Sequence, residues 1–205
     1  MKIYQTATAP NPRRVRMFLA EKGLLDNVEF IEVDIAKGEN LTPEFVAMNP
    51  MKKVPVAVLD DGTSLAETMA ICRYVEEAHP DTPKLLGESP KQKALIEQWL
   101  RWVDFYLMVP VGMCFQHTSG YFKDRMNCFP DYGQDCFSAA EKFLAFLNDH
   151  LKDKTYIMGD SFSAADINAF ATVGFARVVK LRIGADQVHL QAWFDRINQR
   201  ASAKV

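Results

Sequence analysis

The pattern of apolar residues changes near residue 80, and this change constrains the fold more than any other feature of the sequence. Before it, short strand-like segments alternate with helical segments. Pro83, Gly87 and Pro90 then mark residues 81–90 as a linker, because proline and glycine interrupt regular structure. Beyond the linker only helical patterns follow. The sequence therefore predicts two domains, an α/β domain over residues 1–80 and an all-helical (all-α) domain over residues 91–205.

Three strand-like segments and two helical segments define the first domain. Strands are predicted at Lys2–Gln5, Val28–Val33 and Val56–Leu59, and helices at Arg13–Gly23 and Thr68–Glu77. A right-handed crossover would place the first two strands side by side and parallel. With a proline leading into the third strand, this order predicts a thioredoxin-like arrangement.

Helical periodicity dominates the second domain. A long amphipathic helix is predicted from Lys91 to about Met108, and Pro110 with Gly112 predicts a kink or break after it. Ser163 precedes an apolar run and has an acidic partner three residues on, Asp166, which is the pattern of a helix N-cap. Two more helices are predicted at residues 135–151 and 186–199.

Charge and composition exclude several classes of partner. A formal net charge of −2 gives no electrostatic reason to expect nucleic acid or an anionic membrane. No apolar run reaches the roughly 18 residues of a membrane span, and the first residues lack the apolar region of a secretory signal. We therefore expect a cytoplasmic protein with no nucleic-acid and no membrane partner.

The four cysteines do not follow the spacing of a zinc site or a redox motif. None forms a Cys-x-x-Cys pair, and no histidine lies at zinc-finger spacing from them; they are Cys72, Cys114, Cys128 and Cys136. We expect structural thiols in a reducing compartment, no metal and no cofactor.

Residues 52–68 combine several groups that suit the binding of a small zwitterionic peptide. The step Val54-Pro55 leads into an apolar strand, a tight Asp-Asp-Gly turn follows, and the pair Glu67-Thr68 opens a helix. Such a segment presents backbone groups, a carboxylate, a hydroxyl and helix-start N–H groups. The alternative is that Ser64 and Glu67 form an ordinary capping box.

The chain resembles the glutathione transferases over essentially its full length. Four motifs in the family's order carry the resemblance: Ala-Pro-Asn-Pro-Arg-Arg-Val-Arg at Ala9–Arg16, Val54-Pro55, Glu67-Thr68, and Ser-Ala-Ala-Asp at Ser163–Asp166. The resemblance implies an enzyme that conjugates glutathione, as co-substrate, to small hydrophobic electrophiles in detoxification, and a homodimer. It also implies that Ser163–Asp166 serves folding.

The resemblance implies a glutathione site on the first domain. A cis bond at Val54-Pro55 would expose the backbone of Val54 to the cysteinyl residue of glutathione, which pairs with it like an added strand. Thr68 and the helix-start N–H groups would bind the γ-glutamyl carboxylate, and Glu67 would bind the ammonium group.

Three further residues are weaker candidates for glutathione contacts. Lys53 and Asn40 are implied as contacts of the glycyl carboxylate, and Asp104 as an acidic residue that reaches the glutathione of a partner subunit. The alternative for Lys53 is a solvated surface charge, and for Asp104 an ordinary polar residue on the long helix.

Ala9 stands where related transferases have a catalytic Ser or Cys, and Tyr4 is too early to be the loop tyrosine of other classes. The chain is similar to the subgroup with a small residue there. Without a side chain at Ala9, we expect the thiolate to be stabilised by helix-start amides; the amides of Arg13 and Arg14 are expected because the prolines before them donate no N–H.

A further donor is expected beside these amides. A water held by His117 or Ser119 is the first candidate, and the Thr8 hydroxyl competes with it; the nearby Thr6 hydroxyl also stays open. The candidates for the electrophile contacts are residues of the helical domain, namely Tyr106, Met113, Phe115 and Tyr121.

Two other functions stay open. A catalytically weak binding or regulatory protein with the transferase fold would explain Ala9, whereas the intact Pro55, Glu67 and Thr68 favour the enzyme. A glutathione-dependent thiol reductase would need a reactive cysteine at the helix start, and Ala9 argues against it.

Overall fold

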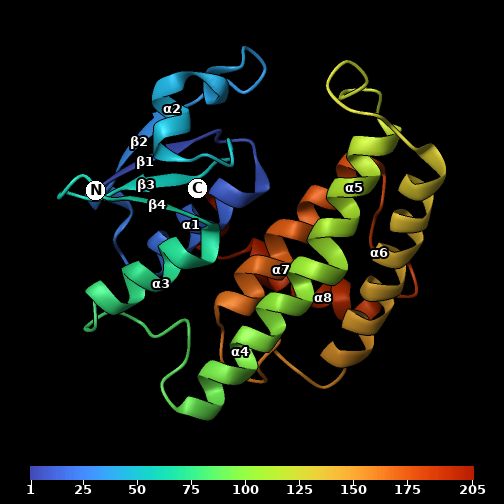
Figure 1. Ribbon diagram of the computed structural model, residues 1–205. Coiled ribbons are helices and arrows are strands. Elements are labelled where there is room, and N and C mark those ends of the chain that lie inside the picture. Colours follow the sequence, from blue (N-terminus) through green and yellow to red (C-terminus); the bar gives the residue numbers. More distant parts are fainter. The chain divides into compact units, whose positions relative to one another are not determined.

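The computed structural model describes all 205 residues, which form two compact units (Figure 1). The first unit comprises Met1–Leu85 together with Ala201–Val205, and the second comprises Leu86–Arg200. The sequence had assigned residues 201–205 to the helical domain. They group with the first unit because they pack on its first helix, a contact that no local pattern in the sequence reveals.

A four-stranded mixed sheet organises the first unit. Its strands are β1 (Lys2–Gln5), β2 (Glu29–Glu32), β3 (Val56–Val58) and β4 (Ser64–Ala66), in the order β2-β1-β3-β4. β1 is parallel to β2, as predicted, whereas β1–β3 and β3–β4 are antiparallel. These strand directions are those of a thioredoxin-like domain, which confirms the predicted fold class.

Helices cover both faces of this sheet. α1 (Pro10–Glu21) and α3 (Thr68–Ala78) lie on one face, and the short α2 (Pro43–Met48) lies on the other (Figure 1). Two 3-10 turns, η1 (Leu25–Asn27) and η2 (Glu39–Leu41), complete the connections. α1 begins three residues earlier than its apolar pattern indicated, because proline fits the first turn of a helix without losing a hydrogen bond.

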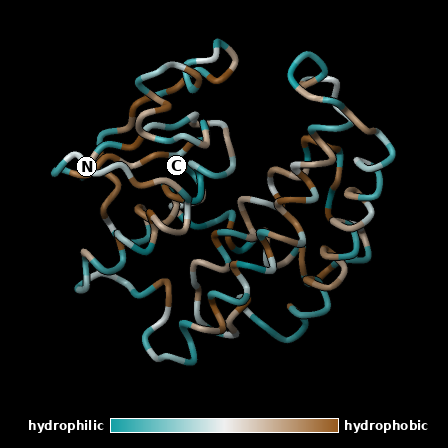
Figure 2. The backbone as a smooth tube through the Cα atoms, viewed as in Figure 1, coloured by the Kyte–Doolittle hydropathy of each residue, from teal (hydrophilic) through white to brown (hydrophobic).

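Apolar residues of the strands and helices fill both sides of the sheet. Figure 2 shows hydrophobic residues along the strands and an alternation of hydrophobic and hydrophilic residues along the helices. On the α2 side, Val54 and Val56 pack with Val33 and Phe45 in one cluster. This cluster fixes the loop that leads into β3. The other side buries apolar residues of α1 and α3, namely Val15, Phe18, Leu19, Ile71 and Val75.

The C-terminal residues form a 3-10 turn, η5 (Ala201–Lys204), on the surface of α1. The Arg13 guanidinium donates to the carbonyl oxygen of Ala203 at 3.1 Å. The Ser202 hydroxyl donates to the Glu21 carboxylate. Ser202 and Ala203 are both buried. The last residues therefore hold α1 at both ends.

The second unit is helical throughout. Its elements are α4 (Pro90–Val103), a π-helical turn η3 (Asp104–Met108), α5 (Val109–Thr118), α6 (Pro130–Leu151), α7 (Ala164–Phe175), a 3-10 turn η4 (Ala176–Val179) and α8 (Val188–Asn198). Instead of an open break near Pro110, the chain passes from α4 to α5 through η3. Pro110 lies in the first turn of α5, where its missing N–H is tolerated. No helix of the structure combines the length and the apolar character that a membrane span requires.

Asp166 is the buried centre of the second unit. Its carboxylate accepts hydrogen bonds from the N–H of Ser163 at 3.0 Å, the N–H of Ile157 at 2.9 Å and the indole N–H of Trp193 at 2.9 Å. Although these donors favour the ionised form, complete burial outweighs them and raises the pKa of Asp166 to about 6. The carboxylate joins the start of α7 to α8, in line with the folding role that the resemblance implied.

Candidate active site

Three segments with candidate residues leave the sheet at the same edge. Tyr4, near the end of β1, is opposite Val56 at the start of β3, and Val56 is opposite Ala66 at the end of β4. Because these pairings are antiparallel, the end of β1, the start of β3 and the end of β4 meet at one edge. The start of α1, the residue Pro55 and the start of α3 are therefore neighbours.

The peptide bond between Val54 and Pro55 is cis, as the resemblance implied. Val54 is buried in the α2-side cluster, so the backbone at this step is held in a fixed place beside β3. The amide and carbonyl of Val54 precede the strand and continue its edge. An extended peptide can pair with such an edge through main-chain hydrogen bonds.

Glu67 is the N-cap residue of α3 and has a left-handed backbone, with φ +69°. Such a conformation is uncommon for a residue other than glycine, and it is concentrated at functional sites. The side chain is exposed, makes no capping hydrogen bond, and has no ion-pair partner within the first unit. The alternative capping box with Ser64 is excluded, because Ser64 lies in β4 and the helix starts only at Thr68.

The start of α3 offers donors beside the Glu67 carboxylate. Thr68 is buried, and Ile71 is the first residue whose N–H is bonded back to the Glu67 carbonyl, at 3.0 Å. The N–H groups of the first three helical residues and the Thr68 hydroxyl therefore lack partners within the helix. A carboxylate next to unused N–H donors is complementary to the carboxylate and ammonium groups of an α-amino acid.

Asn40 and Lys53 belong to one hydrogen-bonded loop region of the first unit. The Asn40 side-chain amide donates to the carbonyl of Lys52 at 2.9 Å, and Asn49 donates to the carbonyl of Lys53 at 2.8 Å. These bonds hold the loop before the cis-proline step. The Lys53 side chain is exposed. The structure thus gives Asn40 a positioning contact and leaves the Lys53 ammonium accessible to an anion.

The start of α1 corrects the expectation for Arg13 and Arg14. Ala9 is the N-cap residue and, as expected, supplies no side-chain contact. The Arg13 N–H donates to the Ala9 carbonyl at 3.3 Å, so it is not an unused donor. Arg14 lies one residue further, where the regular partner is the carbonyl of Pro10.

Asn11 is the residue that the sequence argument missed. Pro10 and Pro12 have no N–H, and Arg13 is bonded, so the Asn11 N–H is the one unused donor of the first turn. In addition, the side-chain oxygen Oδ1 of Asn11 is buried without a hydrogen-bond partner. The sequence did contain a signal for this role, because Asn11 lies between two prolines at a helix start and is the one residue of the three that has a backbone N–H.

The hydroxyl groups near Ala9 differ in their availability. Thr6 donates its hydroxyl proton to the carbonyl of Val33 at 2.6 Å. This bond removes Thr6 as a free donor to a thiolate. Thr8 is exposed, so its hydroxyl stays available. Between the two, only Thr8 remains a competitor for activation of a thiol.

His117 and Ser119 lie at the end of α5 in the helical unit. Nδ1 of His117 accepts a hydrogen bond from the N–H of Phe129 at 3.0 Å. Because Nδ1 is the acceptor, a neutral imidazole carries its proton on Nε2 and donates from there. The Ser119 hydroxyl accepts from the N–H of Tyr121 at 3.1 Å, and its own proton stays available.

Asp104 has partners within its own unit. It accepts a hydrogen bond from the side-chain amide of Asn168 at 3.1 Å, and its carboxylate lies 3.8 Å from the Arg101 guanidinium. Asn168 is buried on α7. Asp104 therefore links the end of α4 to α7, which is the structural alternative that the sequence had left open for this residue.

Cys72 has no part in the site. It is buried on α3, and burial raises the pKa of its thiol. A thiol of this kind is a poor nucleophile. No cysteine lies at the start of α1, so the structure offers no group for a thiol reductase there.

A thioredoxin-like unit with a cis-proline before β3 and an acid–hydroxyl pair at the start of α3, followed by a helical unit, defines a transferase that uses glutathione. Two family descriptions match: "Glutathione S-transferase, N-terminal domain" over residues 8–78, and "Glutathione S-transferase, C-terminal domain" over residues 131–201. The chain belongs to the glutathione S-transferase family. It is thus a glutathione transferase, which confirms the predicted activity.

Individual relatives agree with this assignment. Over its full length the chain is 37% identical to Glutathione S-transferase 2 of Saccharomyces cerevisiae, of which it covers 88%. The crystal structure of Gtt2 from the same yeast matches with a TM-score of 0.94 at 37% identity, covering 100% of this chain and 99% of that one. A glutathione S-transferase domain-containing protein of Marinobacter aquaeolei also matches with a TM-score of 0.94, at 40% identity over 98% of this chain and 99% of that chain.

Proposed function

We propose that this glutathione transferase binds glutathione at the edge of the sheet where β1 ends, β3 begins and β4 ends. The observation that carries the proposal is the start of α3. There the exposed Glu67 carboxylate lies next to the Thr68 hydroxyl and unused N–H groups. Glu67 binds the γ-glutamyl ammonium group, and the helix start with Thr68 binds the γ-glutamyl carboxylate.

The remainder of glutathione extends from this point along the edge. The cysteinyl residue pairs with the backbone of Val54, before the cis-proline Pro55. The glycyl carboxylate binds the exposed ammonium of Lys53, and Asn40 positions the loop that carries this lysine. An exposed lysine contact of this kind has modest strength.

The start of α1 stabilises the thiolate. The Asn11 N–H is the unused donor in the first turn, and the helix start acts as about half a positive charge. This effect contributes up to ~2 kcal/mol when the site is partly buried. At 1.36 kcal/mol per pKa unit it lowers the pKa of a thiol, ordinarily about 8.5, by little more than one unit.

A second donor is needed for a largely ionised thiol at neutral pH. We propose a water molecule as this donor, held by the Nε2–H of His117 or by the Ser119 hydroxyl, with Thr8 as the competing group. His117 then acts as a donor, because its Nδ1 is occupied by the Phe129 N–H.

In the reaction, the glutathione thiolate attacks an electrophilic carbon, and a carbon–sulfur bond forms. A leaving group departs with its electron pair, or an activated double bond accepts the pair and then a proton from water. Binding both reactants on one enzyme lowers the entropic part of the barrier. In the helical unit Tyr106 and Tyr121 are exposed, and Tyr121 stacks on Phe115 at 6.0 Å between ring centroids. These residues and Met113 are the proposed contacts for the electrophile.

We further propose that the protein is a cytoplasmic homodimer with a role in detoxification. Phe105 at 60% exposure and Val109 at 47% exposure lie on η3 and the start of α5, and they give a second copy an apolar surface to cover. Symmetric dimers are the commonest oligomers. Sedimentation at micromolar concentration tests the dimer, and a monomer would contradict it.

Titration of bound glutathione by ultraviolet absorbance tests the catalytic proposal. An enzyme lowers the pKa of the bound thiol below that of free glutathione, and the protein then conjugates a chloroaromatic electrophile. The second candidate is a catalytically weak binding protein, which the missing side-chain donor at Ala9 favours. In that case glutathione binds, but the pKa of its thiol is unchanged.

A further inference from the structure

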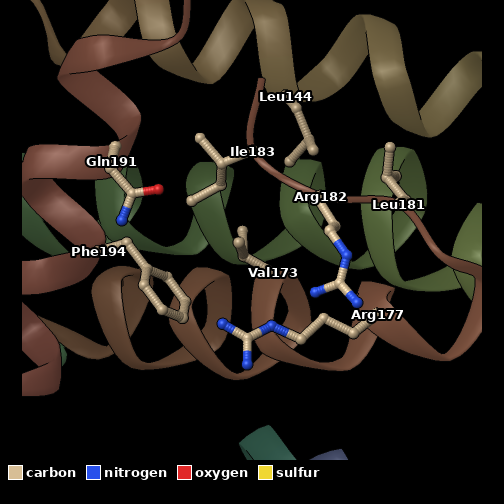
Figure 3. A pocket seen from close by; sticks show the side chains of 8 residues that line it. All are labelled: Leu144, Val173, Arg177, Leu181, Arg182, Ile183, Gln191 and Phe194. Carbon is tan, nitrogen blue, oxygen red and sulfur yellow. The ribbon is translucent and has the colours of Figure 1, made fainter. Parts of the chain in front are cut away.

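The helical unit contains a cavity of about 200 Å³ whose residues have no part in the proposed function (Figure 3). α6, α7, η4, the segment after it and α8 line the cavity, which opens to solvent at the exposed Arg177 and Arg182. Its lining residues are Leu144, Val173, Arg177, Leu181, Arg182, Ile183, Gln191 and Phe194. None of them is acidic. All belong to the second unit, so the cavity is formed by that unit alone.

Buried apolar side chains form the floor of the cavity. Leu144, Val173 and Leu181 are buried with exposures of 5% or less, and Phe194 is 9% exposed. The Phe194 ring is held against Phe170, with 4.6 Å between the ring centroids. Packed side chains of this kind keep their positions, so the floor can receive a flat apolar group without rearrangement.

Two arginines line the same cavity without acidic partners. Arg177 lies over the Phe194 ring, with its guanidinium carbon 5.9 Å from the centroid, and neither Arg177 nor Arg182 has an ion pair in the structure. In Figure 3 the Arg182 guanidinium lies near the side chain of Arg177, whose own guanidinium extends towards Phe194, so that two cationic side chains line one side of the cavity. An anion between them would relieve their repulsion, and guanidinium groups match the planar geometry of a carboxylate.

Gln191 is the remaining polar residue of the lining, and its side chain carries no negative charge that would compete with an anionic ligand. The Gln191 side-chain amide donates to Asp195 at 2.8 Å. One of its two N–H donors is therefore engaged, and its oxygen stays as a neutral acceptor. Asp195 itself does not line the cavity. The arrangement thus combines an apolar floor with two cationic groups and one neutral acceptor.

The volume limits the size of the ligand. A dry cavity of roughly 150 Å³ holds one benzene molecule, whereas pockets for drug-sized ligands begin at about 300 Å³. We propose that this cavity binds a single-ring aromatic carboxylate. The ring packs on Phe194, Leu144 and Val173, and the carboxylate binds Arg177 and Arg182. This site is independent of the glutathione site.

Benzoate is the probe for this proposal, titrated into the full-length protein by NMR in the presence of saturating glutathione. We expect benzoate to shift the signals of Val173, Ile183 and Phe194. Arg177→Gln and Arg182→Gln should each weaken binding about tenfold, the effect of losing one charged hydrogen bond. Lys180→Gln is the matched control: it removes an exposed charge from the same segment without touching the cavity, and should change affinity less than twofold.

Three outcomes would overturn the proposal. Benzamide has the same shape as benzoate but no charge. If benzamide binds as tightly as benzoate, the arginines do not select the ligand. An equal loss of affinity in Lys180→Gln would show a diffuse charge effect. No shifts near Val173 at the highest soluble benzoate concentration would show that the cavity does not bind this class. Thermal unfolding of each variant confirms that the fold is intact.

Discussion

The ammonium group of Lys22 lies 2.8 Å from the carboxylate of Glu76, and the lysine side chain is completely buried. Lys22 also donates to the carbonyl of Pro83 at 2.8 Å, and Glu76 accepts from the N–H of Leu85 at 3.2 Å. The pair therefore connects the end of α1, the helix α3 and the chain that leaves it. These further hydrogen bonds help to satisfy the two charged groups, which is the condition for a buried ion pair to be tolerated.

Removing one member of this pair should destabilise the first unit strongly. Lys22→Met removes the buried ammonium group that contacts the Glu76 carboxylate, and the expected loss is about 3–5 kcal/mol in the free energy of unfolding. Urea denaturation followed by fluorescence measures it. Adding Glu76→Leu to Lys22→Met should restore part of the loss. A single variant as stable as the parent would show that the pair is not buried in solution.

Glu67→Ala should weaken glutathione binding about tenfold or more. The variant loses a charge-assisted contact with the γ-glutamyl ammonium group, which is worth about 1.5–3 kcal/mol. Calorimetric titration with glutathione measures the affinity. Glu77→Ala is the control, since Glu77 is an exposed acid on the same helix and away from its start. Unchanged affinity in Glu67→Ala would remove this residue from the site.

Asn11→Pro should raise the pKa of the bound thiol, by up to about one unit. Proline at this position removes the one unused N–H of the first turn, and the first turn of a helix tolerates proline. Asn11→Ala is the matched control, because alanine keeps the backbone N–H and removes only the side chain. Ultraviolet titration of bound glutathione reads the pKa. If Asn11→Ala shifts the pKa as far as Asn11→Pro does, the side chain and not the amide stabilises the thiolate.

His117→Ala and Ser119→Ala should lower the conjugation rate at saturating glutathione if a held water supplies the second donor. We expect the larger loss in His117→Ala, of about ten-fold to a hundred-fold, and glutathione affinity that is nearly unchanged. Thr8→Ala should keep most of the rate. A Thr8→Ala variant that binds glutathione but has lost turnover would mean that a threonine hydroxyl activates the sulfur.

Asp166 should make the stability of the helical unit depend on pH. Its folded pKa of about 6 lies above the ordinary value of 3.8, so the folded state binds the proton more tightly. The stability from this group is complete below pH 4 and is lost as the pH rises to about 6, a change of about 3 kcal/mol. Denaturant unfolding of the parent and of Asp166→Asn across this range measures it. The variant should lack this slope, and equal slopes would contradict the assignment.

Sequence patterns predicted the elements that follow a strong local rule. Lys2–Gln5 matches β1 to the residue, and the N-cap at Ser163 opens α7. Sequence patterns did not locate β4, which has three residues, or α2, which has six. Such short segments contain hardly one period of the apolar–polar pattern that identifies a strand or helix. Their presence depends on pairing and packing with distant parts of the chain.

For the candidate site, the sequence predicted the residue types better than their bonding. Pro55, Glu67 and Thr68 stand at one edge of the sheet, where the order of motifs had suggested a common site. By contrast, which amide stays unused at the start of α1 depends on whether the helix begins at Pro10 or at Arg13. Propensity does not settle such a boundary, and the hydrogen bond from Arg13 to the Ala9 carbonyl decided it.

The contact of Arg13 with Ala203 affects the order in which parts of the protein can fold while the chain is being synthesised. On the ribosome, the strands and helices of residues 1–85 emerge long before the turn that clasps α1. Until Ala203 leaves the exit tunnel, the helix that carries Asn11 lacks its last supports, the bonds at Arg13 and Glu21. The first unit therefore completes the packing of α1 only after the helical unit has been translated.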